Sequence, residues 1–262
     1  MDLDYKQIKH YIQCPLMFKL KHLTGLKDVE NLYDHYNTSL VKTLQQFYYS
    51  IMDGGTIMSE DALRQKWEAN FCDDKAVNPQ HYMLKPIYGS VIDTRNRVRS
   101  RDLDMRTYTV DGWGLLQTFY RNNKDNPGYP ILIDHEYRIP FGDDAVTGKI
   151  DLVRVINDKP ELIILDTRKQ QAVPFEIETN MEVTLQAYAF TKMFDTIPDI
   201  YYYIIKKNEF VKTTRSKTDV ERAIKIAQNI MKSVKLNIYY PRQTTFCQGC
   251  RMQDLCSKWD GK

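Results

Sequence analysis

The sequence has no long hydrophobic run, and no stretch approaches the ~18 consecutive apolar residues that a membrane-spanning helix requires. The net charge is also small, +3 over 262 residues, so overall charge does not indicate a nucleic-acid partner. Internal repeats and low-complexity segments are absent, and the length is sufficient for a full hydrophobic core. We therefore expect a soluble, cytoplasmic protein without membrane contact, built as one large domain or as a core with an appended helical lobe.

Cysteine is scarce and odd in number, with five residues in the chain. The sequence shows no signal peptide and is too large to need covalent staples, so disulfides are disfavoured. The spacing is more informative than the count. Cys14 stands alone near the start, while Cys247, Cys250 and Cys256 form a C-x2-C-x5-C pattern within the last sixteen residues. Cys72 is left over.

The three C-terminal thiols suit a metal or a cluster, because thiolates one turn apart can converge on one centre. Cys14 is the candidate for a fourth ligand, which would tie the N-terminus to the C-terminus across the whole fold. Three interpretations remain open: an iron–sulfur cluster, a zinc ion, or unliganded buried thiols. We favour the cluster, since zinc ribbons usually carry two C-x2-C-like knuckles and only one is present.

Local charge is more suggestive than the net charge. Arg95, Arg97, Arg99 and Arg101 occupy every second position of one segment. If that segment is extended, one face carries four guanidinium groups and could follow a phosphate backbone. A solvated surface loop explains the same pattern, and it is the interpretation that we favour.

The hydrophobic pattern predicts helices in the first ~125 residues and strands from Ile131 onward. Pro15 is predicted to start a helix, and helical periodicity covers 37–52, 59–71 and 111–123. Strands are predicted at 131–141, 145–156, 161–170 and 199–207, and helices at 180–194 and 217–236. The sequence thus predicts an α+β fold with a helical N-terminal part, a three- to five-stranded mixed sheet, then helices and a cysteine-bound C-terminus.

Two aspartates, Asp151 and Asp166, are predicted near the ends of consecutive antiparallel strands. Two neighbouring carboxylates are costly unless a cation lies between them, and oxygen ligands suit Mg²⁺ or Mn²⁺. Such an ion polarises a phosphate and lowers the pKa of a bound water, which is the chemistry of phosphodiester hydrolysis. In strand geometry Arg168 shares the face of Asp166, so its charge could stabilise a phosphate. Gln186, on the next helix, could add a polar contact.

Five motifs in order make the chain resemble the RecB-type branch of the PD-(D/E)XK nuclease superfamily, including the cluster-bearing nucleases of the CRISPR-adaptation and AddB kind. They are an early "CP" pair at Cys14, "GKID" ending at Asp151, "LDTRK" around Asp166, "QAYAF" from Gln186, and the cysteine triplet from Cys247. Their order and spacing match over almost the whole chain.

This resemblance implies a restriction-endonuclease-like core at 129–240, preceded by a mainly helical part at 1–128 and followed by a cysteine tail at 241–262. It implies a structural [4Fe-4S] cluster on Cys14, Cys247, Cys250 and Cys256. It also implies a Mg²⁺ or Mn²⁺ site on Asp151 and Asp166 for cutting DNA.

The sequence departs from the family pattern at the catalytic lysine. That position holds Arg168, which is always charged and cannot shuttle a proton, so its contribution would be electrostatic. Lys169 could substitute only if a bulge turned it inward. Glu136, which precedes the G-x-x-D strand, is either a third metal carboxylate or an exposed strand residue.

Two further family positions are replaced. The early histidine ligand falls on Val41, with His35 nearly two helical turns upstream, and the tyrosine of Q-x-x-x-Y falls on Phe190, with Tyr188 two residues before it. We therefore expect a metal-dependent DNA nuclease, acting as an exonuclease or end-processing enzyme on single-stranded DNA. The alternative is a catalytically impaired nuclease-fold protein that serves as a DNA-binding or assembly component.

Overall fold

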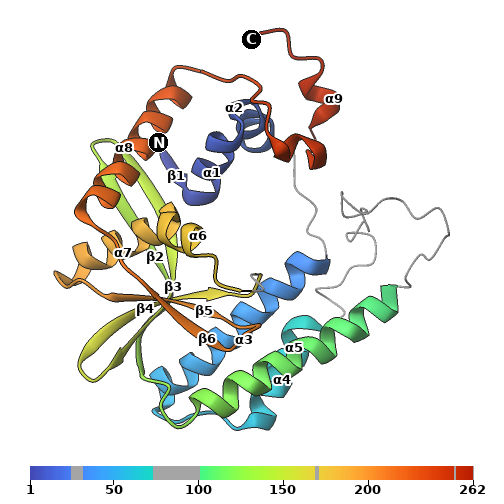
Figure 1. Ribbon diagram of the computed structural model, residues 1–262, viewed down its shortest axis with the longest axis vertical. Coiled ribbons are helices and arrows are strands. Elements are labelled where there is room, and N and C mark those ends of the chain that lie inside the picture. Colours follow the sequence, from blue (N-terminus) through green and yellow to red (C-terminus); the bar gives the residue numbers. More distant parts are fainter. Residues whose placement is uncertain (25–31, 73–100, 169–170, 251, 262) are drawn as a thin grey trace.

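The computed structural model describes residues 1–24, 32–72, 101–168, 171–250 and 252–261 (Figure 1). Of the arginine-rich segment, Arg95, Arg97 and Arg99 lie outside the described residues, and Arg101 is the first residue of a helix.

A mixed sheet forms the centre of the fold, which confirms the predicted α+β class. Within the described residues it has six strands rather than the predicted three to five. They are β1 (Asp2–Asp4), β2 (Tyr129–Phe141), β3 (Asp144–Ile156), β4 (Lys159–Asp166), β5 (Asp199–Ile204) and β6 (Glu209–Thr213). The sequence analysis missed β1 and β6, because three and five residues are too few to show a clear alternation.

Tight turns set the register of the antiparallel strands. Gly142, with φ of 64°, lies in the two-residue connection between β2 and β3. Asn157 and Asp158 connect β3 to β4 and have φ of 51° and 61°, the left-handed pair of a type I′ hairpin turn. The pairing of β4 with β5 is parallel and spans the helical crossover between them.

Strand β3 changes partners along one of its edges. Parallel β1 pairs with residues 145–147 of β3, whereas β4 pairs with residues 152–156. Residues 148–151 therefore lie between the two pairings, while β2 follows β3 along its other edge. This gap in the ladder contains the "GKID" motif.

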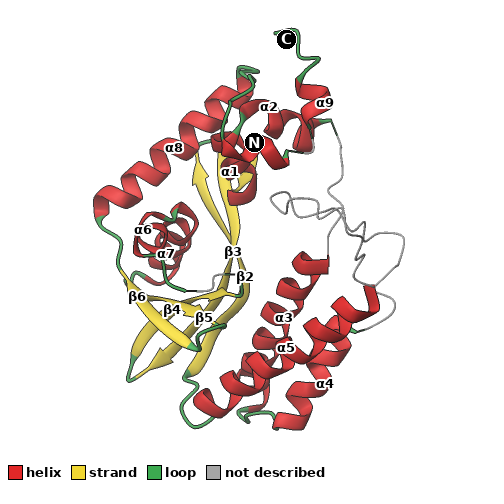
Figure 2. Ribbon diagram, turned by 45° about the vertical axis from the view of Figure 1, so that its right-hand side comes forward, coloured by secondary structure: helices red, strands yellow, loops and turns green. Residues whose placement is uncertain are grey.

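Helices cover both faces of the sheet (Figures 1 and 2). Three long helices form one layer: α3 (Leu32–Gly54), α4 (Glu60–Phe71) and α5 (Arg101–Asn123). The other side carries α6 (Pro174–Thr179), α7 (Met181–Phe194) and α8 (Lys217–Lys235). One end of the molecule holds α1 (Tyr5–Gln13), α2 (Pro15–Phe18), the π-helical turn Lys19–Leu23 and α9 (Gln253–Cys256). Both faces of the sheet are buried, which accounts for the continuous apolar run of β4.

The two ends of the chain pack against each other. The Tyr11 hydroxyl donates a hydrogen bond to the Ile238 carbonyl (2.7 Å), and the Leu16 amide donates to the Tyr240 carbonyl (3.0 Å). The Arg242 guanidinium donates to the carbonyl of Ile12 (2.7 Å). Main-chain and side-chain hydrogen bonds thus bring the early "CP" segment beside the start of the cysteine tail. In the described part of the chain, no helix has the length and apolar character to cross a membrane.

Candidate active site and cysteine cavity

Asp151 and Asp166 meet where β3 and β4 diverge. The last paired residues are Leu152 and Ile163, and beyond them the Leu165 amide donates to Asp151 Oδ2 over 3.2 Å instead of to the β3 main chain. This hydrogen bond fixes the Asp151 carboxylate beside the end of β4, where Asp166 is the last residue. The structure therefore brings the two predicted metal ligands together.

The Asp151 carboxylate carries an electrostatic cost. Burial is the main cause, followed by the charge of Glu182 and, more weakly, those of Asp134 and Asp166, and together they raise the pKa of Asp151 to about 7. The hydrogen bond from the Leu165 amide lowers the pKa of Asp151, but it offsets this rise only in part. A carboxylate placed in this way is stabilised by a nearby cation.

Helix α7 presents Glu182 and Gln186 one turn apart on one face. The Asn180 side chain caps the helix by accepting from the Glu182 amide (2.9 Å), which places Glu182 in the first turn. Gln186 is 3% exposed, and its Oε1 has no hydrogen-bond partner among the residues that the structure describes. Since a buried amide oxygen without a donor is costly, this atom fits a position next to a cation or water.

Sequence reasoning missed Glu182. The sequence feature that could have identified Glu182 is its position four residues before Gln186, which places both side chains on the same helical face. By contrast, Phe190 is fully buried and its ring stacks on Phe194 at 4.7 Å, so the position of the family tyrosine serves the core here.

Helix α3 reaches the site from the opposite layer. The Gln45 side-chain amide donates to the main-chain carbonyl of Asp151 at 3.5 Å. Val41 lies one turn earlier on the same helix, so the aligned histidine position belongs to the helical face nearest the site. His35 is distant from this contact: its Nε2 pairs with the Phe71 carbonyl (3.2 Å) and its ring stacks on Phe71. His35 is a core histidine of the helical layer.

Arg168 does not continue the strand, so the expectation that it shares a strand face with Asp166 is wrong. β4 ends at Asp166 because the Asp166 side chain accepts from the Arg168 amide (3.0 Å), a local contact that competes with the ladder. The Arg168 guanidinium instead pairs with Asp34 on α3 (3.0 Å). Lys169 lies outside the described residues.

Strand β2 adds two carboxylates. Ile133 pairs with Leu152 and His135 with Ile150, so Asp134 lies at the position opposite Asp151, with φ of 47°. Glu136 is exposed and pairs with Lys149 instead. Its predicted role as a third metal ligand stays a prediction, while Asp134 is the β2 carboxylate that stands opposite Asp151.

A steric requirement explains why position 148, the first residue of "GKID", is a glycine. A Cβ at this position would lie 2.5 Å from the Tyr137 hydroxyl oxygen. Tyr137 is buried, and burial and the charges of Glu182 and Asp151 raise its pKa. The glycine therefore leaves room for the Tyr137 side chain, which lies across from it on β2.

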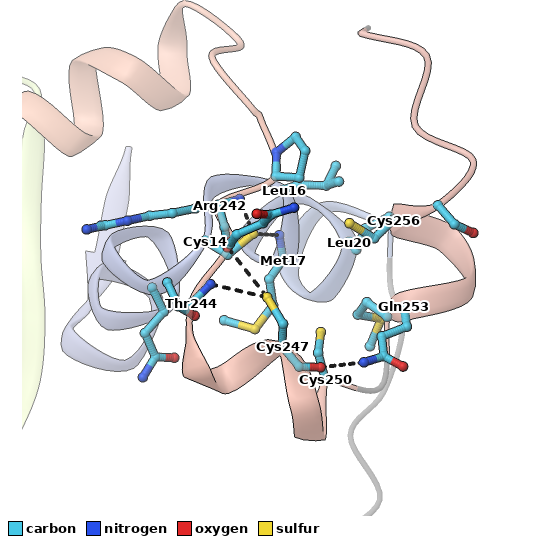
Figure 3. A pocket seen from close by; sticks show the side chains of 15 residues that line it. Cys14, Leu16, Met17, Leu20, Arg242, Thr244, Cys247, Cys250, Gln253 and Cys256 are labelled. Atoms are coloured by element: carbon cyan, nitrogen blue, oxygen red, sulfur yellow. Dashed lines mark hydrogen bonds between the residues drawn. The ribbon is translucent and has the colours of Figure 1, made fainter.

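The four cysteines singled out from the sequence line one cavity of about 250 Å³ between the chain ends (Figure 3). Amides of Arg242 and Met17 donate to Cys14 Sγ at 3.4 and 3.5 Å, and the Thr244 amide donates to Cys247 Sγ at 3.4 Å. Burial, followed by the neighbouring cysteines, raises the pKa of the Cys256 thiol.

These thiols surround a space and do not converge on a point. Among the residues that the structure describes, no three or more His, Cys, Asp or Glu side chains form a group that could hold one metal ion. Cys72 lies elsewhere, with its sulfur 3.5 Å from the Thr109 hydroxyl in the helical layer.

A comparison of the sequence with models of known families agrees with the observed fold. The model of the PD-(D/E)XK nuclease superfamily matches residues 3–257. The chain belongs to the PD-(D/E)XK nuclease superfamily. This match confirms the superfamily that the sequence motifs indicated.

A comparison with solved structures shows a similar fold in another protein. A "putative exonuclease" from Eubacterium rectale aligns with a TM-score of 0.54 and 9% identity, covering 97% of this chain and 86% of that one. The protein SSO0001 aligns over 97% of this chain and 95% of its own, with 12% identity and a TM-score of 0.34, too low to carry an argument. Among curated proteins, none matches the sequence.

Proposed function

We propose that this PD-(D/E)XK protein is a metal-dependent DNA nuclease, acting as an exonuclease or end-processing enzyme on single-stranded DNA. The observation that carries the proposal is the hydrogen bond from the Leu165 amide to Asp151, which holds one carboxylate beside the end of the strand that carries the other, Asp166. Membership of the superfamily supports the reaction class, and the preference for single strands or ends rests on the resemblance of the sequence motifs.

Asp151 and Asp166 would hold Mg²⁺ or Mn²⁺, which binds proteins through one or two carboxylates and completes its shell with water and phosphate oxygens. The fit rests on two observations: burial and neighbouring carboxylates raise the pKa of Asp151 to about 7, and, within the described part of the chain, no donor reaches the buried Gln186 Oε1. When bound, the ion polarises the phosphate and lowers the pKa of a water.

The chain's own side chains position the reactants. Gln186 would orient a water or a metal ligand through its amide oxygen, and Glu182 adds negative charge on the same side. Arg168 would stabilise phosphate charge after leaving Asp34, while Lys169 and Glu136 stay candidates from the sequence for a cation and a third ligand.

The direct test is cleavage of end-labelled single- and double-stranded DNA by anaerobically purified protein with Mn²⁺. Asp166→Ala should abolish cleavage, and undiminished cleavage would show that the assigned site is wrong. Asp199→Ala is the matched control: this half-buried aspartate begins β5 at the opposite end of the β4–β5 pair and contacts Lys212.

Cys14, Cys247, Cys250 and Cys256 would hold a [4Fe-4S] cluster that clasps the chain ends. A four-iron cluster is larger than a single zinc ion, so the four thiolates that would hold it can lie farther apart. The 250 Å³ cavity favours the cluster over zinc, and amide hydrogen bonds to sulfur support bound thiolates. A brown protein with stoichiometric iron supports it, and a colourless zinc protein contradicts it.

The second candidate is a nuclease-fold protein that binds DNA or assembles with partners without cutting. Two observations favour it: Arg168 is paired with Asp34, and the histidine position holds Val41. Tight DNA binding without cleavage, across Mg²⁺, Mn²⁺ and several substrates, would support this candidate.

A further inference from the structure

The parallel strands β4 and β5 end side by side at the proposed metal site. Asp166, the last residue of β4, pairs with Ile204, and its carbonyl accepts from the Ile205 amide at 3.2 Å. Lys206 follows in the turn that leads into β6. The segment after β5 therefore lies directly beside an aspartate that the proposed metal would bind.

The Lys206 side chain joins this strand end to the beginning of α3. Its ammonium donates to the Arg168 carbonyl at 3.1 Å and lies 5.8 Å from the centre of the Tyr33 ring. Tyr33 is the second residue of α3, and it is 37% exposed although its side chain is large and aromatic. An exposed tyrosine ring with a cation over it thus lies next to the strand end that carries Asp166.

Tyr33 is supported by aromatic residues of the helical layer. Its ring centre lies 6.5 Å from that of Tyr108 on α5, with the planes at 50°, and Tyr108 lies 4.7 Å from the buried Tyr36. A ring that already has a fixed orientation loses little conformational entropy when a flat ligand lies on it. The structure therefore offers a preorganised aromatic surface beside the site.

The charges around Tyr33 favour an anionic ligand. Arg168 pairs with Asp34, the residue that follows Tyr33, at 3.0 Å, so the carboxylate next to the ring in sequence has a counter-charge. Lys206 and the exposed Lys207 add two positive charges in the turn after β5. A ring and a cation side by side provide separate partners for the base and the phosphate of a nucleotide.

We propose that Tyr33 and Lys206 form a nucleotide subsite that selects single-stranded DNA: one base stacks on the Tyr33 ring, and the Lys206 ammonium binds the phosphate next to that base. The inference rests on the proposed nuclease function for its choice of DNA as the ligand. The base takes the ring face that the ammonium covers, and the ammonium moves to the phosphate.

The selectivity has a physical reason. In a duplex each base is stacked and paired, so only an unpaired base is available to lie flat on a side-chain ring. Tyr33 and Lys206 therefore bind and position the strand beside Asp166, and neither takes part in breaking the phosphodiester bond.

Binding without cleavage tests the base contact. The affinity of the whole protein is measured for a fluorescent single-stranded oligonucleotide and for the same sequence as a duplex, without added divalent metal. Tyr33→Ala should weaken single-strand binding about 10-fold and duplex binding less than about 2-fold, whereas Tyr33→Phe should bind like the wild type. Tyr129→Ala is the control, because it removes a 56% exposed tyrosine from β2 at the end of the sheet away from Asp166.

A modified oligonucleotide tests the same contact without changing the protein. Single abasic sites are introduced into the strand one position at a time. The wild type should lose affinity about 10-fold at one position, and Tyr33→Ala should show no further loss at that position. Such non-additivity is expected only where the ring and the missing base contact each other.

Salt dependence tests the phosphate contact. Lys206→Ala should lower the slope of log affinity against log salt by roughly 0.7 for single-stranded DNA, the value for one phosphate contact. Lys212→Ala is the matched control and should leave the slope unchanged, since Lys212 lies 5.6 Å from the Tyr201 ring at the other end of the β5–β6 hairpin. Thermal unfolding shows whether each variant is folded.

The outcomes separate the subsite from the nuclease proposal. If Asp166→Ala abolishes cleavage while Tyr33→Ala keeps the wild-type affinity for single strands, the subsite is overturned and the nuclease stands. If Tyr33→Ala loses single-strand affinity but the wild type cuts no DNA with Mn²⁺, the nuclease proposal fails and the subsite stands as a binding site. An equal loss of affinity for single strands and duplexes would overturn the stacking of an unpaired base.

Discussion

Arg168 forms an ion pair with Asp34, 3.0 Å from guanidinium to carboxylate, and this contact joins the end of β4 to the beginning of α3. The side chain that replaces the family lysine is thereby directed to the helical layer. A fork-shaped guanidinium is well suited to hold a carboxylate, whereas a lysine is a compact charge on a flexible stem.

We predict that Arg168→Lys raises nuclease activity, because the ammonium can leave Asp34 and approach the phosphate more easily. The measurement is the initial rate of cleavage on an end-labelled oligonucleotide with Mn²⁺. Arg222→Lys is the control, since Arg222 forms a similar exposed pair with Asp219 on α8. No gain in a folded Arg168→Lys protein would indicate that the site has been lost more broadly.

Cysteine substitutions should distinguish the proposed cluster ligands from a cysteine that does not bind the cluster. Cys250→Ser should lower iron content and the visible absorbance of the anaerobically purified protein, because it removes a thiolate from the cavity between the chain ends. Cys72→Ser should leave both unchanged, since Cys72 lies in the helical layer beside Thr109. Equal iron content in the two variants would contradict the assigned ligands.

Two glycines of α5 should respond in opposite directions to alanine. At Gly112 a Cβ would lie 2.3 Å from Cζ2 of the buried Trp67, whereas at Gly114 it would meet nothing within 4 Å. Gly112→Ala should destabilise the fold by about 1–3 kcal/mol through overpacking. Gly114→Ala should stabilise it by up to about 1 kcal/mol, because alanine favours a helix interior. Urea unfolding measures both, and a stabilised Gly112→Ala protein would show that Trp67 moves freely.

The buried ion pair of the β3–β4 hairpin should be sensitive to the loss of one partner. Arg154 donates to Glu161 (3.0 Å), to the Tyr48 hydroxyl (3.3 Å) and to the Pro127 carbonyl (3.1 Å). Glu161→Gln leaves the guanidinium without its counter-charge and should cost about 3–5 kcal/mol. Asp199→Asn, which breaks the exposed pair with Lys212, should cost under about 1 kcal/mol. Similar losses in the two variants would contradict this distinction.

Local patterns in the sequence determined much of the fold. The helix at 180–194 and the strand at 145–156 carry their own periodicity and caps, and the structure has α7 at Met181–Phe194 and β3 at Asp144–Ile156. The position of Asp151 near the end of β4, where Asp166 lies, was also predictable, because a short turn joins the two antiparallel strands, although the ladder itself ends at Leu152 and Ile163. The early cysteine and the C-terminal triplet were recognised from spacing, and they line one cavity.

Tertiary structure decided what the local pattern leaves open. β1 and β6 are too short to be seen alone and exist because a neighbouring strand pairs with them. The direction of Arg168 depends on Asp34, 134 residues earlier in the chain, and no periodicity could show that β4 ends before it. Glu182 and Asp134 became neighbours of Asp151 only through the packing of α7 and the register of β2. Charged side chains at the ends of elements follow the partners that the fold brings to them, and these contacts determine the chemistry of the site.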